Sequence, residues 1–164
     1  MSNDYIISAE EVLSHLSFGQ RLIGLDLGTK TIGLGLSNPD LTVATPLETI
    51  RRKKFQQDTD LLLSICAEWN VGALVLGLPF NMDGTEGPRA QSTRSFARNL
   101  HQKTDLPMLF WDERLSTVAV TRTLLDLDTS RAKRADVVDK MAASFILQGV
   151  LDRLAHLAHP PETD

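Results

Sequence analysis

Two apolar runs joined by a short turn at residues 28–30 constrain the fold of this chain more than any other segment. Apolar runs separated by a glycine-containing turn predict a tight β-hairpin, here over residues 23–37. The first run carries one carboxylate, Asp26, among aliphatic residues. A carboxylate buried in a strand is costly unless a partner compensates it. Two interpretations follow: a cation bound at the strand end, or a side chain that caps the turn.

The size and charge of the chain limit the functions that this hairpin can serve. The 164 residues suffice for one domain with a sizeable core. The net charge of −4 excludes a generally basic nucleic-acid binder, although basic runs occur at residues 51–54 and 131–134. The single cysteine, Cys66, excludes an intrachain disulfide and a multi-cysteine zinc site, and it favours a reducing compartment. No signal peptide or membrane-spanning run is recognisable, so we expect a cytoplasmic protein without a membrane partner.

Strand and helix patterns alternate along the rest of the chain. Strands are expected at residues 41–50, 73–78 and 108–111, the first at a sheet edge because Pro46 interrupts it. Helices are expected at residues 8–16, 55–69, 89–102, 116–125 and 136–154. Three strands followed by strand–helix alternation predict an α/β fold, with a mixed sheet covered by helices on both faces.

Acidic residues fall where such a sheet usually carries its site, beyond the carboxyl ends of the parallel strands. Asp26 lies near the end of the first strand, and Glu113 lies just past the last. In the helix at 136–154 a polar stripe recurs every four residues, and Asp139 falls opposite that stripe on the core side; the stripe consists of Lys140, Ser144, Gln148 and Asp152. The geometry therefore permits Asp26, Glu113 and Asp139 to converge.

Three converging carboxylates would repel one another strongly at neutral pH. A divalent metal ion relieves that repulsion. Hard oxygen ligands without histidine or cysteine favour Mg²⁺ or Mn²⁺. The pattern thus predicts a magnesium or manganese site at this edge of the sheet.

Several ordered segments resemble the motifs of the YqgF/RuvX family. They begin Asp26-Leu-Gly-Thr-Lys, Gly77-Leu-Pro-Phe-Asn, Asp112-Glu-Arg-Leu-Ser and Val138-Asp-Lys-Met-Ala. The family has an RNase H-like fold, and its members are described as Holliday-junction resolvases and as nucleases that mature the 5′ end of precursor 16S ribosomal RNA. The resemblance covers residues 21–154. It implies a five-stranded RNase H-like nuclease domain at 21–155, an N-terminal extension with a short helix at 1–20, and a tail at 156–164.

The resemblance also implies a chemistry. Asp26, Glu113 and Asp139 match the family's acidic catalytic positions, where they would hold Mg²⁺ or Mn²⁺ for two-metal hydrolysis of a phosphodiester bond. Pre-16S ribosomal RNA, free or within a ribosomal particle, is the expected substrate, and branched DNA is the alternative.

Candidate nucleic-acid contacts each have a simpler alternative. Lys30 in the hairpin turn could approach a phosphate or stay an exposed turn residue. Asn81 and Thr85 could touch the cleaved strand or serve only the turn at residues 79–88, and Arg114 could bind phosphate or pair with Asp112. The two basic runs could bind backbone phosphates or be solvated surface. The residues proposed as phosphate contacts in these runs are Arg52, Lys53, Lys133 and Arg134.

Two other classes of function stay open. The Asp26-Leu-Gly-Thr segment also resembles the first phosphate loop of actin-like sugar kinases and ATPases. Those enzymes need a second such domain and an adenosine motif, which this sequence lacks. The chain could also be an RNA-binding ribosome-assembly factor with an idle acidic site, although the presence of all three carboxylates argues against that.

Overall fold

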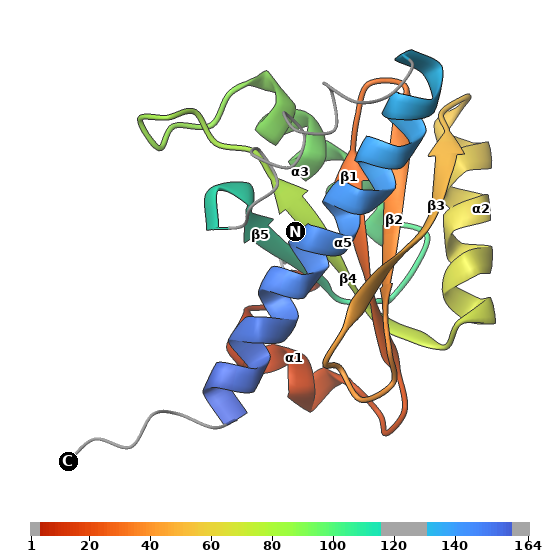
Figure 1. The fold of residues 1–164 in the computed structure, drawn as a ribbon. Coiled ribbons are helices and arrows are strands. Elements are labelled where there is room, and N and C mark those ends of the chain that lie inside the picture. Colours follow the sequence, from red (N-terminus) through yellow and green to blue (C-terminus); the bar gives the residue numbers. More distant parts are fainter. Residues whose placement is uncertain (1–3, 116–130, 159–164) are drawn as a thin grey trace.

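The computed structural model describes residues 4–115 and 131–158, and within α5 it describes side chains from residue 138 onward. The helix expected at 116–125 and most of the tail expected at 156–164 lie outside these residues. Within them, the chain forms one mixed sheet with helices against both of its faces (Figure 1).

The sheet has five strands in the order β3-β2-β1-β4-β5. They are β1 (Arg21–Leu27), β2 (Thr31–Ser37), β3 (Ala44–Arg51), β4 (Val71–Leu78) and β5 (Met108–Asp112). The β1, β2 and β3 strands are antiparallel neighbours, whereas β4 and β5 run parallel to β1. The predicted mixed five-stranded sheet is therefore confirmed, with β3 and its Pro46 at one edge as expected.

The hairpin that opens the sheet closes as its sequence predicts. The backbone N–H of Gly28 donates to the carbonyl of Thr31 at 2.8 Å, directly between β1 and β2. In the ladder that follows, Leu25 pairs with Leu34, and Asp26 pairs with Gly33. This register places Asp26 next to a residue without a side chain.

The helices divide between the two faces of the sheet (Figure 1). One face packs α2 (Phe55–Glu68) and α3 (Pro88–His101) around a core that includes Ile23 and Leu25. The other packs α1 (Ala9–His15) and α5 (Arg131–Ala158) around a core that includes Leu22 and Val75. Successive residues of β1 thus alternate between two apolar layers, as a strand buried on both sides must.

The segment before β1 completes the edge of the sheet at β5. The carbonyl of Tyr5 accepts a hydrogen bond from Met108 N–H at 2.7 Å, and Ile7 N–H donates to the Met108 carbonyl at 2.8 Å. Ser8 and Glu11 form a capping box at the start of α1, whose Val12 is fully buried. These contacts attach the N-terminal extension to the sheet.

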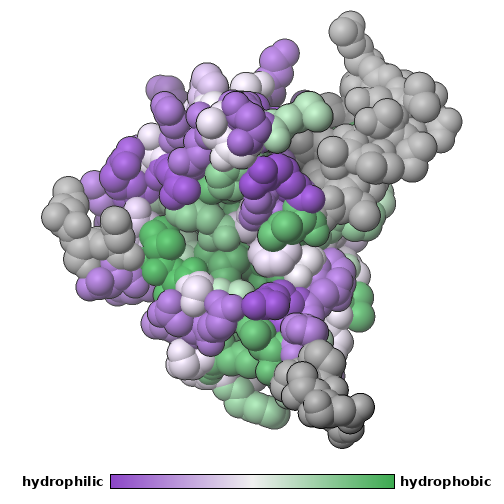
Figure 2. Space-filling model, turned by 90° about the vertical axis from the view of Figure 1, so that its left-hand side faces the viewer, coloured by the Kyte–Doolittle hydropathy of each residue, from purple (hydrophilic) through white to green (hydrophobic). Residues whose placement is uncertain are grey.

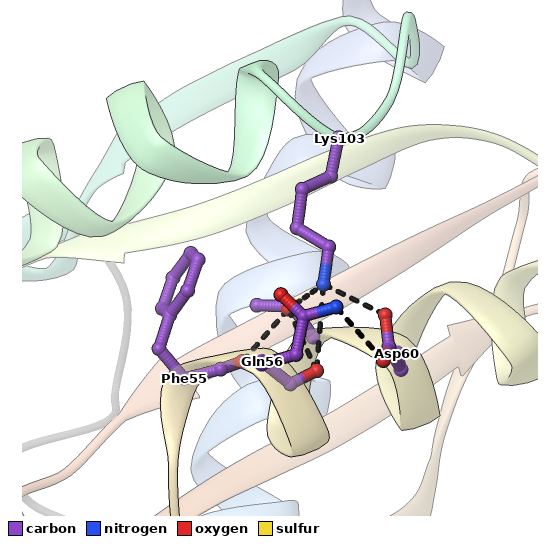
Figure 3. Close-up of polar contacts among 5 residues, drawn as sticks. Phe55, Gln56, Asp60 and Lys103 are labelled. Atoms are coloured by element: carbon purple, nitrogen blue, oxygen red, sulfur yellow. Dashed lines mark hydrogen bonds and ion pairs between the residues drawn. The ribbon is translucent and has the colours of Figure 1, made fainter.

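Lys103 ties the end of α3 to the beginning of α2 (Figure 3). Its Nζ donates to Thr59 Oγ1 at 2.6 Å and to Asp60 Oδ1 at 2.7 Å, and it lies 5.9 Å from the centroid of the Phe55 ring. Because these partners occupy the first two turns of α2, the bonds fix the spacing of the two helices at the start of α2.

The face of the molecule beyond β5 carries a hollow in which hydrophobic residues gather between hydrophilic ones (Figure 2). A depression of about 500 Å³ at this edge is lined by Phe110 and Trp111, among others. In the described ranges, no helix combines the length and apolar character that crossing a membrane requires.

Candidate active site

Glycines on one face of the sheet let α5 lie directly against the strands. A β-carbon on Gly24 would come within 2.7 Å of the Ala143 carbonyl oxygen, and one on Gly35 within 2.8 Å of Ser144 Cα. At Gly33 it would overlap the backbone carbonyl of Asp139. These distances are shorter than β-carbons tolerate, so the helix backbone takes the space of absent side chains. This close packing holds the part of α5 that begins at residue 138 over the end of the hairpin.

Asp26 and Asp139 meet in one depression at this point. Asp26 is only 2% exposed, and its strand partner Gly33 is the residue on which Asp139 rests. Both acidic residues line a depression of about 460 Å³, together with the hairpin turn. The Asp139 carboxylate accepts a hydrogen bond from the Thr31 hydroxyl, which fixes its orientation. The structure therefore brings together two of the three carboxylates that the sequence singles out.

The Glu113 side chain lies against β4, the strand next to β1, on the same face of the sheet. Glu113 begins the short 3₁₀ helix η1 (Glu113–Leu115) after β5, and its Oε1 lies 2.8 Å from where a β-carbon on Gly77 would be. Leu76 pairs with Leu25 in the parallel ladder, so continuing this register by one residue sets Gly77 beside Asp26. Adjacent strands are about 4.8 Å apart. Across the described part of the chain, however, no three acidic, histidine or cysteine side chains already form a metal-binding group.

The polar stripe expected on α5 does not face solvent along its length. Ser144 is buried against Gly35, and the Gln148 amide donates to the Thr42 carbonyl at 3.1 Å and accepts from Ala44 N–H at 2.8 Å. The reason is that α5 packs on β2 and β3 as well as on β1. Some polar side chains of the helix therefore contact the edge of the sheet instead of solvent.

Basic side chains border the depression. Lys30 is exposed in the hairpin turn and lines it, as does Arg89 in the first turn of α3. Arg89 Nη2 donates to the Leu27 carbonyl at 3.3 Å, and Arg52 Nη1 donates to the Gly28 carbonyl at 2.7 Å. The sequence reasoning overlooks Arg89; its position beside Pro88, at the start of a helix that follows β4, is the signal that could have found it.

Arg114 pairs with Asp112, which is one of the two roles that the sequence suggests for it. It forms an ion pair with Asp112 at 2.7 Å, and its guanidinium lies 4.8 Å from the centroid of the Phe80 ring. The hydrogen bond from Arg114 holds the pKa of the Asp112 carboxyl below its ordinary value.

Asn81 and Thr85 are also engaged locally. Asn81 Nδ2 donates to Thr85 Oγ1 at 3.0 Å, and the Thr85 hydroxyl donates to Asp83 Oδ1 at 2.6 Å. The Asn81 side chain would also lie 3.3 Å from a β-carbon on Gly87, the residue that precedes α3. These contacts fold the loop back onto the start of the helix that carries Arg89.

Of the remaining basic candidates, Lys53 does not line the depression. The backbone N–H of Lys53 donates to both oxygens of the Asp58 carboxylate, at 3.0 and 3.2 Å, while its side chain is exposed. Lys133 and Arg134 lie in α5 before residue 138, outside the side chains that the structure describes.

Known proteins match both the sequence and the fold. The model of the family RuvX, described as Holliday junction resolvase, matches residues 20–153. A Paramagnetospirillum magneticum protein is 61% identical over 153 residues, which cover 93% of this chain and 99% of that protein. A Bradyrhizobium diazoefficiens protein is 66% identical over 136 residues, which cover 83% and 84% of the two chains. Both proteins are named "Putative pre-16S rRNA nuclease".

Among solved structures, Thermus thermophilus RuvC in complex with a Holliday junction substrate has a TM-score of 0.53 at 12% identity. The similarity covers 83% of this chain and 96% of RuvC, and at this identity it shows a shared fold. The family match spans most of the chain, and the sheet order and helix placement agree with the RNase H-like expectation. The chain therefore belongs to the RuvX family of nucleases.

Proposed function

We propose that this protein is a metal-dependent endonuclease that hydrolyses a phosphodiester bond during maturation of the 5′ end of pre-16S ribosomal RNA. The observation that carries the proposal is the meeting of Asp26 and Asp139 in one depression bordered by Lys30 and Arg89. The names of relatives that are 61% and 66% identical support the choice of substrate. The reaction would take place in the cytoplasm, on free precursor RNA or within a ribosomal particle.

The donor groups at the site suit a hard divalent cation. Asp26 and Asp139 offer carboxylate oxygens in one depression, and the described residues that line it include neither histidine nor cysteine. Oxygen donors of this kind favour Mg²⁺ or Mn²⁺ over softer metals. We assign Asp26 and Asp139 as metal ligands, with Glu113 completing the set from η1, which follows β5. When bound, such ions lower the pKa of a water molecule and stabilise the leaving oxygen.

The chain's own residues position the reacting groups. Asp26 sits on a strand buried on both faces, so its carboxylate has little freedom to move. Thr31 orients the carboxylate of Asp139 through its hydroxyl. We assign Lys30 and Arg89 to the phosphates that flank the scissile bond, because both are cationic and both line the depression that holds the two acids. Asn81, Thr85 and Arg114 would shape the loop at the border of the site.

Cleavage assays on two substrates test the proposal. The purified protein should cut a transcript spanning the 5′ end of pre-16S ribosomal RNA in Mg²⁺ or Mn²⁺, and EDTA should abolish the cut. Cleavage of a four-way DNA junction alone would instead support the resolvase that the family description names. Binding of the transcript without cleavage under every metal condition would support a non-catalytic assembly factor and overturn the nuclease.

A further inference from the structure

Three adjoining depressions form one groove that leaves the candidate active site along α3. The depression that holds Asp26 and Asp139 shares Arg89 and the hairpin turn with a second one of about 160 Å³. The second shares Arg52 and Phe96 with a third of about 510 Å³, which extends to Phe55. We call the second and third depressions the α3 groove. It continues from the acids, past two arginines, to an aromatic ring.

The two arginines are already oriented. Arg89 donates to the Leu27 carbonyl at 3.3 Å, and Arg52 donates to the Gly28 carbonyl at 2.7 Å. A guanidinium has five N–H donors, so one such bond fixes its direction and leaves capacity for a phosphate. Among the described residues that line the α3 groove, none is acidic. The groove therefore suits a chain of negative charges in a protein whose net charge is −4.

The far end of the groove carries an exposed aromatic ring. Phe55 is 37% exposed and lines the third depression. Its ring packs edge-to-face on the buried Phe96, with centroids 5.6 Å apart, and Lys103 approaches it from the turn after α3 (Figure 3). A fixed aromatic ring beside a cation is a stacking surface for an unpaired base. The bases of a duplex are already stacked on their neighbours and cannot use it.

We propose that the α3 groove binds a single-stranded nucleic-acid segment adjacent to the scissile phosphate. Arg89 and Arg52 would bind successive parts of the phosphate backbone, and Phe55 would stack on a base. This inference rests on the proposed nuclease function and deepens it, because it names the strand form that the enzyme holds next to its site. Single-stranded RNA and single-stranded DNA present the same phosphates and base faces to these residues.

Binding without cleavage tests the groove directly. The full chain in EDTA is titrated against fluorescein-labelled 12-nucleotide strands of unstructured RNA and of DNA, and anisotropy is followed at several salt concentrations. Arg52→Ala and Arg89→Ala should each weaken affinity roughly fivefold and make the log–log salt slope shallower by about 0.7. Phe55→Ala should weaken affinity roughly fivefold or more without changing the slope, and Phe55→Tyr should restore it. A 12-base-pair duplex should compete at least about tenfold less well than either strand.

Arg153→Ala is the matched control, because Arg153 pairs with Glu10 on the β5 side of the molecule and does not line the groove. Its affinity and salt slope should equal those of the parent. Parent-like binding by both groove arginine variants, or equal competition by the duplex, would overturn the proposal. The EDTA assay separates this outcome from a failure of the proposed function. Groove-dependent binding without any metal-dependent cleavage would contradict the nuclease function but not the binding groove. Metal-dependent cleavage together with parent-like binding by the groove variants would contradict the binding groove but not the nuclease function.

Discussion

The backbone carbonyl of Asp139 occupies the space that a β-carbon on Gly33 would need. Gly33 is also the residue that pairs with Asp26 across the β1–β2 ladder. One glycine therefore sets both how closely α5 approaches the sheet and how near Asp139 comes to Asp26.

Replacing Gly33 should reduce both stability and activity. In Gly33→Ala the added methyl group must push α5 away, at a cost of about 1–3 kcal/mol in the free energy of unfolding. The displaced Asp139 should lower the cleavage rate on the order of 100-fold, because catalytic geometry tolerates little misplacement. Urea unfolding and cleavage of the RNA transcript measure the two effects.

Gly35→Ala is the control for this substitution. A β-carbon there would press on Ser144, at 2.8 Å, further along α5 from the acidic pair. We expect a similar loss of stability with a clearly smaller loss of activity. Full activity in a folded Gly33→Ala protein would show that the approach of α5 does not set the site.

Removing the charge of Asp26 should abolish cleavage and leave the fold intact. Asp26→Asn is nearly isosteric, but it takes away the anionic oxygen that a divalent cation requires. Cleavage should fall below about 1% of the parent rate, while the melting temperature stays level or rises because a buried charge is lost. Asp40→Asn, in the exposed turn between β2 and β3, should behave like the parent. Unchanged cleavage in folded Asp26→Asn would remove Asp26 from the catalytic set.

The hairpin, the parallel strands and the placement of Asp26 at a strand end follow from patterns local to the sequence. Apolar alternation and turn residues determine where β1 and β2 lie, and the 3.6-residue period places Asp139 on the core side of its helix. These signals predict the strand end that carries Asp26 and the helix face that carries Asp139, but the contact of α5 with Gly33 brings the two together. Glu113 is harder to place, because its position depends on how η1 turns over Gly77 after β5 has ended.

Other features depend on packing that no local pattern contains. The sequence shows the glycines at 24, 33, 35 and 77 but not that all four face α5. Arg89 reaches the site only because α3 begins beside the end of β1, a relation between segments 62 residues apart. Likewise, the sequence pattern assigns Gln148 to the polar side of its helix, but the packing of α5 on β3 lets it accept a hydrogen bond from Ala44 N–H. Tertiary contact decides each of these cases.

Cys66 should make stability depend on alkaline pH. Its side chain is buried in the apolar core beneath α2, and burial raises the pKa of the thiol to about 12. The thiol of an unfolded chain ionises near pH 8.5. Above that pH the folded state holds a proton that the unfolded state has lost, so the stability falls by up to about 1.4 kcal/mol per pH unit until the folded pKa is reached.

Cys66→Ala lacks this ionisation, so its stability deficit relative to the parent should narrow as the pH rises from 8 to 10. Urea unfolding of both proteins across this range measures the difference between their free energies of unfolding. The contributions of the other titrating groups are the same in both proteins and cancel in this difference. A constant difference would contradict the raised pKa. The folded parent should also resist thiol reagents at pH 8.

Metal binding should stabilise the parent protein through Asp139. Two carboxylates in one depression repel each other when no cation is bound. Mg²⁺ or Mn²⁺ should therefore raise the melting temperature, since the ions bind the folded state. Asp139→Asn should be more stable than the parent in EDTA and gain less from metal. A variant that gains as much as the parent would place Asp139 outside the metal site.

Thr31 should act on the same site as a positioning residue. Its hydroxyl donates to the Asp139 carboxylate from the first residue of β2, and it is largely buried there. Thr31→Val keeps the shape of the side chain and removes the donor, so the carboxylate loses the bond that orients it. Removing a group that orients a metal ligand typically lowers metal affinity or activity by about 10–100-fold.

The Mg²⁺ concentration for half-maximal cleavage should rise by that factor in Thr31→Val and return toward the parent value in Thr31→Ser. A merely structural threonine would lower the melting temperature without moving the metal dependence, and that result would contradict the assignment.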